Sequence, residues 1–191
     1  TLQVGNGGAP GAIAGDLTNT GAMLSNVAGN TPLGGTISGT GGLTQAGSGS
    51  LVLTGTNTYT GGTTINAGGT LQLGNGGATG SIIGDVTNNG TLLSNVAGNT
   101  TLGGTISGSG GLTQAGSGTL TVTGNNTYTG PTTFNSGGTL QVGNGGATGA
   151  IGGNVTNNGN LVFNVAGNTT VGGAISGSGG LTQAGSGTLS L

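Results

Sequence analysis

The stretch LTQAGSGTL at residues 112–120 decides the fold, because most of it occurs three times in the chain. LTQAGSG stands at 43–49, 112–118 and 181–187, and each copy begins 69 residues after the previous one. The flanking sequence keeps this period, so that three units align without a gap: residues 1–69, 70–138 and a truncated 139–191. Such self-similarity is typical of stacked modules. We expect the chain to be a single solenoid, 1–191, and a piece of a longer protein.

A shorter element, Gly-Thr-Leu or a close variant, recurs inside each unit. In the second unit it begins at Gly69, Gly90 and Gly118, and the next one begins at Gly138. The steps of 21, 28 and 20 residues suit the coils of a repeat protein. We therefore predict three coils per unit, and one core column in which the apolar residue of each tripeptide lies on the next: Leu2, Met23, Leu51, Leu71, Leu92, Leu120, Leu140, Leu161 and Leu189.

The residues around these tripeptides indicate strands and tight corners. LQL at 71–73 and LTV at 120–122 alternate apolar and polar side chains, as half-buried strands do. Glycine and β-branched threonine are poor helix formers, and glycine–asparagine clusters such as 74–77 suit sharp turns. The predicted fold is all-β: a parallel β-solenoid, or β-helix, of about nine coils of 20–28 residues, with neighbouring strands about 4.8 Å apart.

The composition excludes several classes of partner and site. The 191 residues include 52 glycines, no lysine, arginine, histidine or cysteine, and a formal net charge of −2. A glycine-rich chain can be disordered, but apolar residues that recur in register favour order. Without cations the chain has nothing to neutralise phosphates or anionic lipids, so we expect no nucleic-acid partner. It also has no run of 18 apolar residues, so we expect no direct membrane insertion. Without cysteine it has no disulfides or thiolate metal ligands.

The chain is also predicted not to be an enzyme, and to have no catalytic, cofactor-binding or metal site. The usual bases and nucleophiles His, Cys and Lys are absent. Asp16 and Asp85 lie a whole unit apart, too far for a carboxylate pair, and Asn154 replaces them in the third unit. We expect these three residues to bond local backbone in turns. GNGGATG at 74–80 lacks the helix and acid of a dinucleotide-binding loop, and the aspartates of a calcium-binding β-roll.

Four aromatic residues are the remaining candidates. Tyr59 and Tyr128 occupy the same place in NTYTG. They are either exposed contact aromatics or, as we favour, tyrosines that lie along the coil surface with the hydroxyl in water. Phe134 and Phe163 are predicted to be core residues.

A longer run, GSGGLTQAGSGTLTVTGNNTYTGPTTFNSGGTLQVGNGG at 108–146, resembles the autotransporter-associated β-strand repeat found in passenger domains of type V secreted bacterial surface proteins. The first unit carries the same run at 39–74, and the third carries its opening at 177–191. The resemblance implies a right-handed β-helix held outside an outer membrane by a C-terminal β-barrel that is not in this sequence. The family commonly has lysine where this chain has Gln45, Gln114 and Gln183, which puts charge-based adhesion in doubt.

The function that this resemblance favours is a structural and adhesive stalk segment on a bacterial cell surface. Rows of threonine and asparagine on uncharged flat sides could associate laterally, and uncovered solenoid ends could stack end to end. Self-association, as in aggregation or biofilm, is thus the expected contact, with a host or matrix surface as another. Two alternatives stay open: a subunit of a self-assembling extracellular fibre, and a spacer for an enzymatic domain outside this chain.

Overall fold

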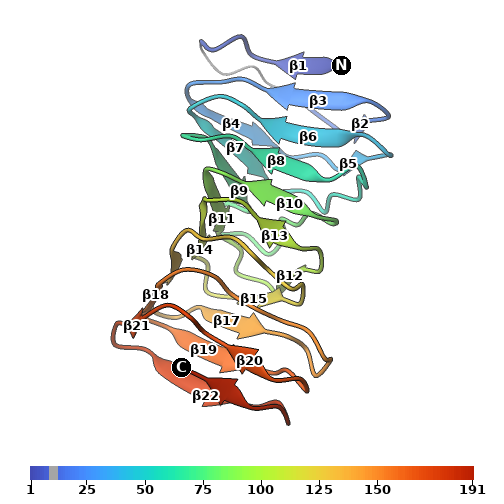
Figure 1. The fold of residues 1–191 in the computed structure, drawn as a ribbon. Coiled ribbons are helices and arrows are strands. Elements are labelled where there is room, and N and C mark those ends of the chain that lie inside the picture. Colours follow the sequence, from blue (N-terminus) through green and yellow to red (C-terminus); the bar gives the residue numbers. More distant parts are fainter. Residues whose placement is uncertain (9–12) are drawn as a thin grey trace.

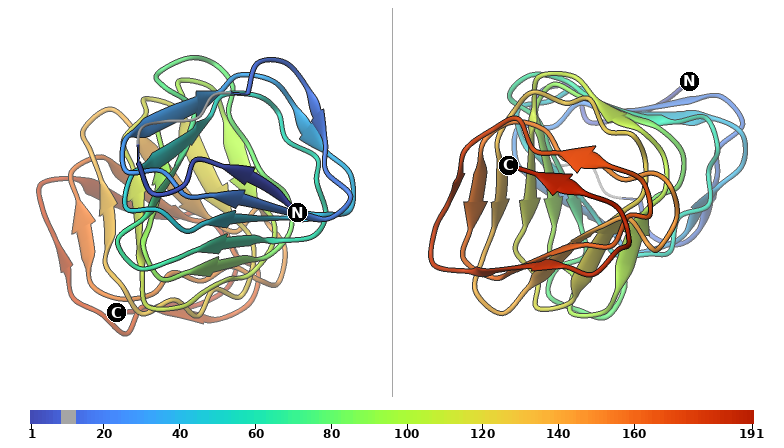
Figure 2. Two further views of the ribbon diagram at one scale, coloured as in Figure 1. Left: turned by 90° about the horizontal axis from the view of Figure 1, so that it is seen from above. Right: turned by 60° about the horizontal axis from the view of Figure 1, so that its bottom comes forward.

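Parallel β-strands make up all the regular structure of the described chain (Figure 1). A computed structural model describes residues 1–8 and 13–191. The chain winds into a β-solenoid of about nine turns. Seen from the N-terminal end, it runs clockwise as it recedes, so the coil is right-handed (Figure 2). The predicted all-β parallel solenoid is confirmed.

Three sheets form the faces of the solenoid, and each coil visits them in turn. The first face holds β1 (Leu2–Val4), β3 (Ala22–Ser25), β6 (Gly42–Gln45), β8 (Thr63–Ile65), β10 (Val86–Asn88) and β13 (Ile106–Ser107). The second holds β4 (Asn30–Leu33), β7 (Ser50–Leu53), β9 (Thr70–Leu73), β11 (Thr91–Ser94), β14 (Gly111–Gln114), β16 (Thr132–Phe134), β18 (Val155–Asn157) and β21 (Ile175–Ser176). The third holds β12 (Thr100–Leu102), β15 (Thr119–Val122), β17 (Thr139–Val142), β19 (Asn160–Phe163) and β22 (Gly180–Gln183).

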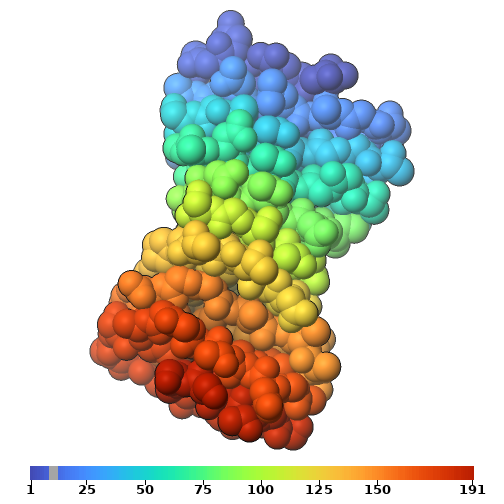
Figure 3. Space-filling view, in the orientation of Figure 1, coloured from blue at the N-terminus to red at the C-terminus, as the bar shows by residue number. Residues whose placement is uncertain are grey.

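Two short pairs complete the faces at opposite ends of the rod. The pair of β2 (Leu17–Thr18) and β5 (Ile37–Ser38) belongs to the third face, because β5 follows a second-face strand and precedes a first-face strand. By the same reasoning, the pair of β20 (Thr169–Thr170) and β23 (Leu189–Ser190) belongs to the first face. Consecutive residues form successive layers along the rod, as the ordered colour bands show (Figure 3).

The coils are shorter and more uniform than the tripeptide spacing predicts. Partners in register lie 20 residues apart (Leu51 and Leu71), 21 apart (Leu71 and Leu92) or, at a longer coil, 23 apart (Thr132 and Val155). The predicted step of 28 residues, from Leu92 to Leu120, is wrong, because Leu92 pairs with Leu112. Leu112 follows two glycines and so lacks the Gly-Thr-Leu signature.

Because of this coil length, the 69-residue unit is out of phase with the solenoid. On the first face, Leu2 pairs with Met23, Met23 with Leu43 and Leu43 with Thr63, which completes three coils. Leu71, the residue equivalent to Leu2 in the second unit, lies on the second face. Leu140, one unit later, lies on the third face. Each unit therefore spans three and one-third turns, not the predicted three, and presents the same sequence one face further round.

The prediction of a single leucine column is wrong for the same reason. The nine residues are divided among the faces: Leu2 and Met23 lie on the first, Leu51, Leu71 and Leu92 on the second, and Leu120, Leu140 and Leu161 on the third, while Leu189 pairs with Thr169 in the short sheet that returns to the first face. Inward side chains from all faces meet in one apolar cluster along the axis. Phe134 and Phe163 belong to this cluster, as predicted.

Glycines at the corners let successive coils approach closely. A Cβ atom on Gly118 would lie 1.9 Å from the carbonyl oxygen of Gly98 in the preceding coil. Other corners use left-handed backbone: Gly76 has a φ of 89°, and its N–H donates to the carbonyl oxygen of Asn95 at 2.7 Å. Gly145 repeats this bond to Asn164 at 2.7 Å. The glycine content of the chain thus reflects coil stacking.

The close approach at Gly118 predicts that Gly118→Ala destabilises the chain by about 1–3 kcal/mol, the usual cost of overpacking. Gly103→Ala is the matched control, because a Cβ there meets only the Thr123 hydroxyl oxygen, at 3.9 Å. It should leave stability unchanged or raise it slightly. Urea unfolding of both variants checks this, and equal midpoints would contradict the stacking of these corners.

Candidate interaction surface

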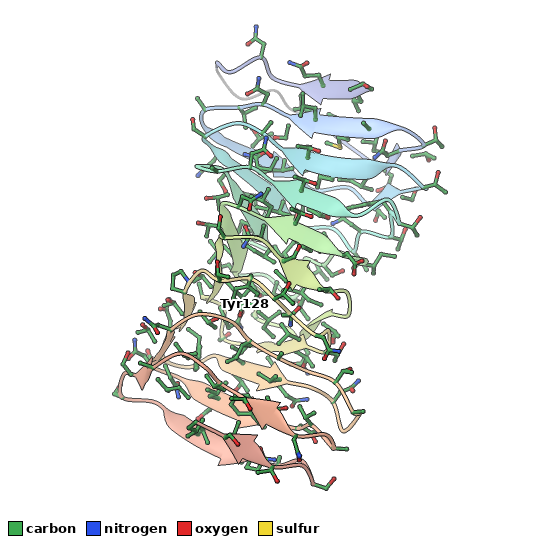
Figure 4. All side chains as sticks on the ribbon, viewed as in Figure 1. Tyr128 is labelled. Atoms are coloured by element: carbon green, nitrogen blue, oxygen red, sulfur yellow. The ribbon has the colours of Figure 1, made fainter. Side chains whose placement is uncertain are left out.

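The two tyrosines are interior residues. Tyr59 is 0 % exposed and Tyr128 1 % exposed, and Figure 4 shows Tyr128 within the stack of coils. Each hydroxyl shares a hydrogen bond with a buried threonine hydroxyl, Tyr59 with Thr63 at 2.7 Å and Tyr128 with Thr132 at 2.6 Å. Both sequence interpretations, exposed contact and surface-lying ring, are therefore wrong. The alternation in TNTYT at 56–60 carried the signal, since Thr56, Thr58 and Thr60 are exposed while the residues between them are buried.

Burial also changes the acidity of these phenols. It raises the pKa of Tyr59 to about 12, although the hydrogen bond shared with Thr63 lowers it. Burial raises the pKa of Tyr128 as well, against the hydrogen bonds with Thr132 and Gly152. Neither tyrosine is available as a surface contact.

Asparagine and aspartate side chains connect one coil to the next, a role that the sequence did not reveal. The Asp16 and Asp85 carboxylates accept from the backbone N–H of Thr36 and Thr105, each 20 residues further on, and Asn154 does the same for Ala174. The predicted bond to local backbone is wrong. Because an amide serves equally well in the third unit, the charge is not required for this bond.

Buried asparagines bond to the preceding coil as well as to the next one. The amide oxygen of Asn57 accepts from the Ile37 N–H at 2.9 Å, and its amide nitrogen donates to the carbonyl oxygens of Gly55 and Ser81. Asn126 repeats the arrangement one unit later, with Ile106 and Ala150. Such side chains satisfy backbone groups that the short strands leave unpaired.

The glutamines at the family's lysine positions lie at corners of the core. Gln45 is 0 % and Gln114 2 % exposed, whereas Gln183, in the final described coil, is exposed. Each donates its amide hydrogens to two carbonyl oxygens of its own corner, which for Gln45 are those of Gly47 and Gly49. At Gln45 and Gln114 the departure from lysine therefore changes a corner of the interior, not an adhesive surface.

Outward side chains form an uncharged row along each face. On the first face, Thr44, Thr64, Thr87 and Ser107 are cross-strand neighbours. On the second face, the same unit positions give Thr113, Thr133, Thr156 and Ser176. These two sets, here called the hydroxyl rows, place their side chains about 4.8 Å apart along the rod. On the third face, the outward cross-strand neighbours are also uncharged: Thr101, Thr121, Gln141, Val162 and Thr182.

The described residues contain no cluster of three or more potential metal ligands. They also contain no helix that is long and apolar enough to span a membrane. The side-chain charges are those of Asp16 and Asp85 alone. What the solenoid presents to a partner is therefore a hydroxyl- and amide-rich surface on three sides.

The sequence of these coils matches a known repeat twice. Residues 43–73 and 112–142 match the model of the passenger-associated-transport-repeat. These two segments of the chain are therefore similar to passenger-associated-transport-repeats. The first runs from β6 to β9 and the second from β14 to β17, one face further round. Both matched segments include the buried pair of tyrosine and threonine, Tyr59 with Thr63 and Tyr128 with Thr132.

A curated relative supports the same assignment. The chain is similar to the "Adhesin BmaC autotransporter" of Brucella suis biovar 1 (strain 1330), with 56% identity over 46 residues. This match covers 24% of the chain and 1% of the relative, so the chain spans only a very small part of that protein. No solved structure matches the chain. The resemblance to an autotransporter passenger repeat is confirmed, and it supports a surface-associated passenger role.

The buried phenols predict that stability falls as the pH rises from 10 to 12. Below pH 10 the folded and the unfolded chain both keep their tyrosine protons, so the stability that the buried phenols contribute is fully present. Above pH 10 the unfolded chain loses these protons, while folded Tyr59 keeps its proton to about pH 12, so the free energy of unfolding falls. The chain has no lysine, arginine or cysteine to titrate in this window. Urea unfolding at pH 7, 10 and 12 measures the effect.

The double variant Tyr59→Phe, Tyr128→Phe is the control for this prediction. It should lose about 1 kcal/mol per hydrogen bond at pH 7 and show little dependence on pH between 10 and 12. An equally steep loss of stability in the double variant would contradict the assignment to these tyrosines.

Proposed function

We propose that the chain is a structural and adhesive rod segment of a bacterial surface passenger, and that it associates with copies of itself through its hydroxyl rows. The observation that carries this proposal is the presence of the same uncharged row on different faces of one rod. Two such rods have matching hydroxyl spacing, because both are set by the strand spacing. The near absence of charge removes the repulsion that keeps most proteins apart.

The comparisons support the cellular setting of this proposal. A relative whose printed name is an adhesin and an autotransporter contains closely similar sequence. On this basis we propose an extracellular location, with the chain held at the outer membrane by a barrel elsewhere in the full protein. The proposed role is non-catalytic, since the chain has none of the histidine, cysteine or lysine side chains that usually act as bases and nucleophiles. Contact with neighbouring cells, as in aggregation or biofilm, follows from self-association.

Sedimentation velocity of the purified chain tests the contact directly. We expect the unmodified chain to form oligomers as its concentration rises. The variant Thr87→Lys, Thr156→Lys places one cation in each hydroxyl row and should weaken association by about tenfold or more, because like charges would then face each other across the contact. Thermal unfolding of each variant verifies that the fold is retained.

The control variant is Asn75→Lys, Asn144→Lys, at exposed corners away from the rows. It changes the net charge from −2 to 0, as the row variant does, so the total charge is matched. Its association should stay close to that of the unmodified chain. A strictly monomeric unmodified chain would overturn self-association, and equal behaviour of the two variants would overturn the hydroxyl rows as the contact.

A further inference from the structure

A shallow groove interrupts the third face between its N-terminal pair of strands and its five-stranded sheet. It lies where one coil is longer, since Val86 pairs with Thr63, 23 residues earlier, and not 20 or 21. The extra length is in the segment between β9 and β10, which forms no strand and touches its neighbour through an isolated bridge, Thr56 to Ser81. The groove has a volume of about 310 Å³, within the usual range for small-molecule sites.

The lining of this groove combines hydroxyls, an amide and an apolar shelf. Thr56, Ser81 and Thr101 line it; Thr56 and Thr101 are exposed and Ser81 is half-buried. Asn99 uses its amide oxygen to accept from the Thr119 N–H and has no described partner for its amide nitrogen. The shelf is Ile83, a large apolar side chain that is 43 % exposed.

From this lining we propose that the groove binds a neutral sugar ring of a glycan. A pyranose has hydroxyls around its edge and C–H groups on its faces, so the ring can lie on Ile83 while its edge bonds the groups of Ser81 and Asn99. Charged ligands are disfavoured, because the lining has no ionised side chain to pair with an anion or a cation. The proposal does not depend on self-association, because it concerns a single rod.

The equivalent segment one unit later supplies an internal comparison. There Ala150 replaces Ser81, and Gly152 replaces Ile83, so both the hydroxyl and the shelf are missing. Gly152 also lies so close to the carbonyl oxygen of Tyr128 that a Cβ atom would be 1.7 Å from it. The second segment, which faces another side of the rod, is therefore expected not to bind.

Isoleucine δ1-methyl NMR tests this site in the intact chain, because Ile83 and Ile151 report on the two segments separately. The probes are neutral tetrasaccharides of glucose, mannose and N-acetylglucosamine, with tetragalacturonate as the charged counterpart. We expect at least one neutral probe to shift the Ile83 methyl signal saturably, with a dissociation constant in the millimolar range, and to leave Ile151 unchanged. Ile83→Val assigns the signal.

Two variants and a control complete the experiment. Ser81→Ala, which copies the third unit, should weaken binding about threefold to tenfold through one lost hydrogen bond, and Ile83→Ala should abolish the saturation-transfer signal of the bound sugar. Thr148→Ala, in the second segment, should change neither. The proposal is overturned if no neutral probe shifts Ile83 at tens of millimolar, if tetragalacturonate shifts it equally, or if Ser81→Ala and Thr148→Ala bind alike.

Discussion

Parallel backbone pairing between successive coils is the constraint on which the rest of this structure depends. It fixes the distance between coils, so that each side chain lies above its partner from the preceding turn. A few leucines can then form a core, because each packs along the axis as well as across it. The same constraint requires glycine where two corners touch, as at Gly118 and Gly98. It also explains why the polar side chains of Asp16, Asp85 and Asn154 bond the next coil and not their own turn.

The sequence was sufficient to predict the class of fold, but not the number of turns that each 69-residue unit makes. The 69-residue repeat and the alternation in segments such as LTV at 120–122 correctly indicated a parallel β-solenoid. The number of turns per unit could not be read from Gly-Thr-Leu alone, because Leu112 occupies a core position after two glycines. A repeat of sequence and a turn of backbone are different periods. Here their mismatch of one-third of a turn distributes identical segments over three faces.

The interior polar residues were the hardest part to predict. In most proteins tyrosine, asparagine and glutamine favour partly exposed positions, and this preference placed Tyr59 and Tyr128 on the surface in the sequence interpretation. In a narrow solenoid the corners bring many carbonyl oxygens inward, and buried amides and hydroxyls satisfy them. Gln45 shows this, because both hydrogens of its amide are used by glycine carbonyls of one corner. The hydroxyl rows could not be predicted without the strand register, because Thr64 and Thr87 are recognised as neighbours only when the longer coil between them is known.

The corner bonds of Gly76 and Gly145 have a consequence for the chemical lifetime of the molecule. Each of these two glycines follows an exposed asparagine. In such a pair the backbone nitrogen of the glycine can attack the side-chain amide of the asparagine, which releases ammonia and leaves an acidic residue. Here that nitrogen is committed to a carbonyl oxygen of the neighbouring coil, at 2.7 Å in both cases. The folded rod therefore resists slow deamidation at these two turns for as long as its coils remain stacked.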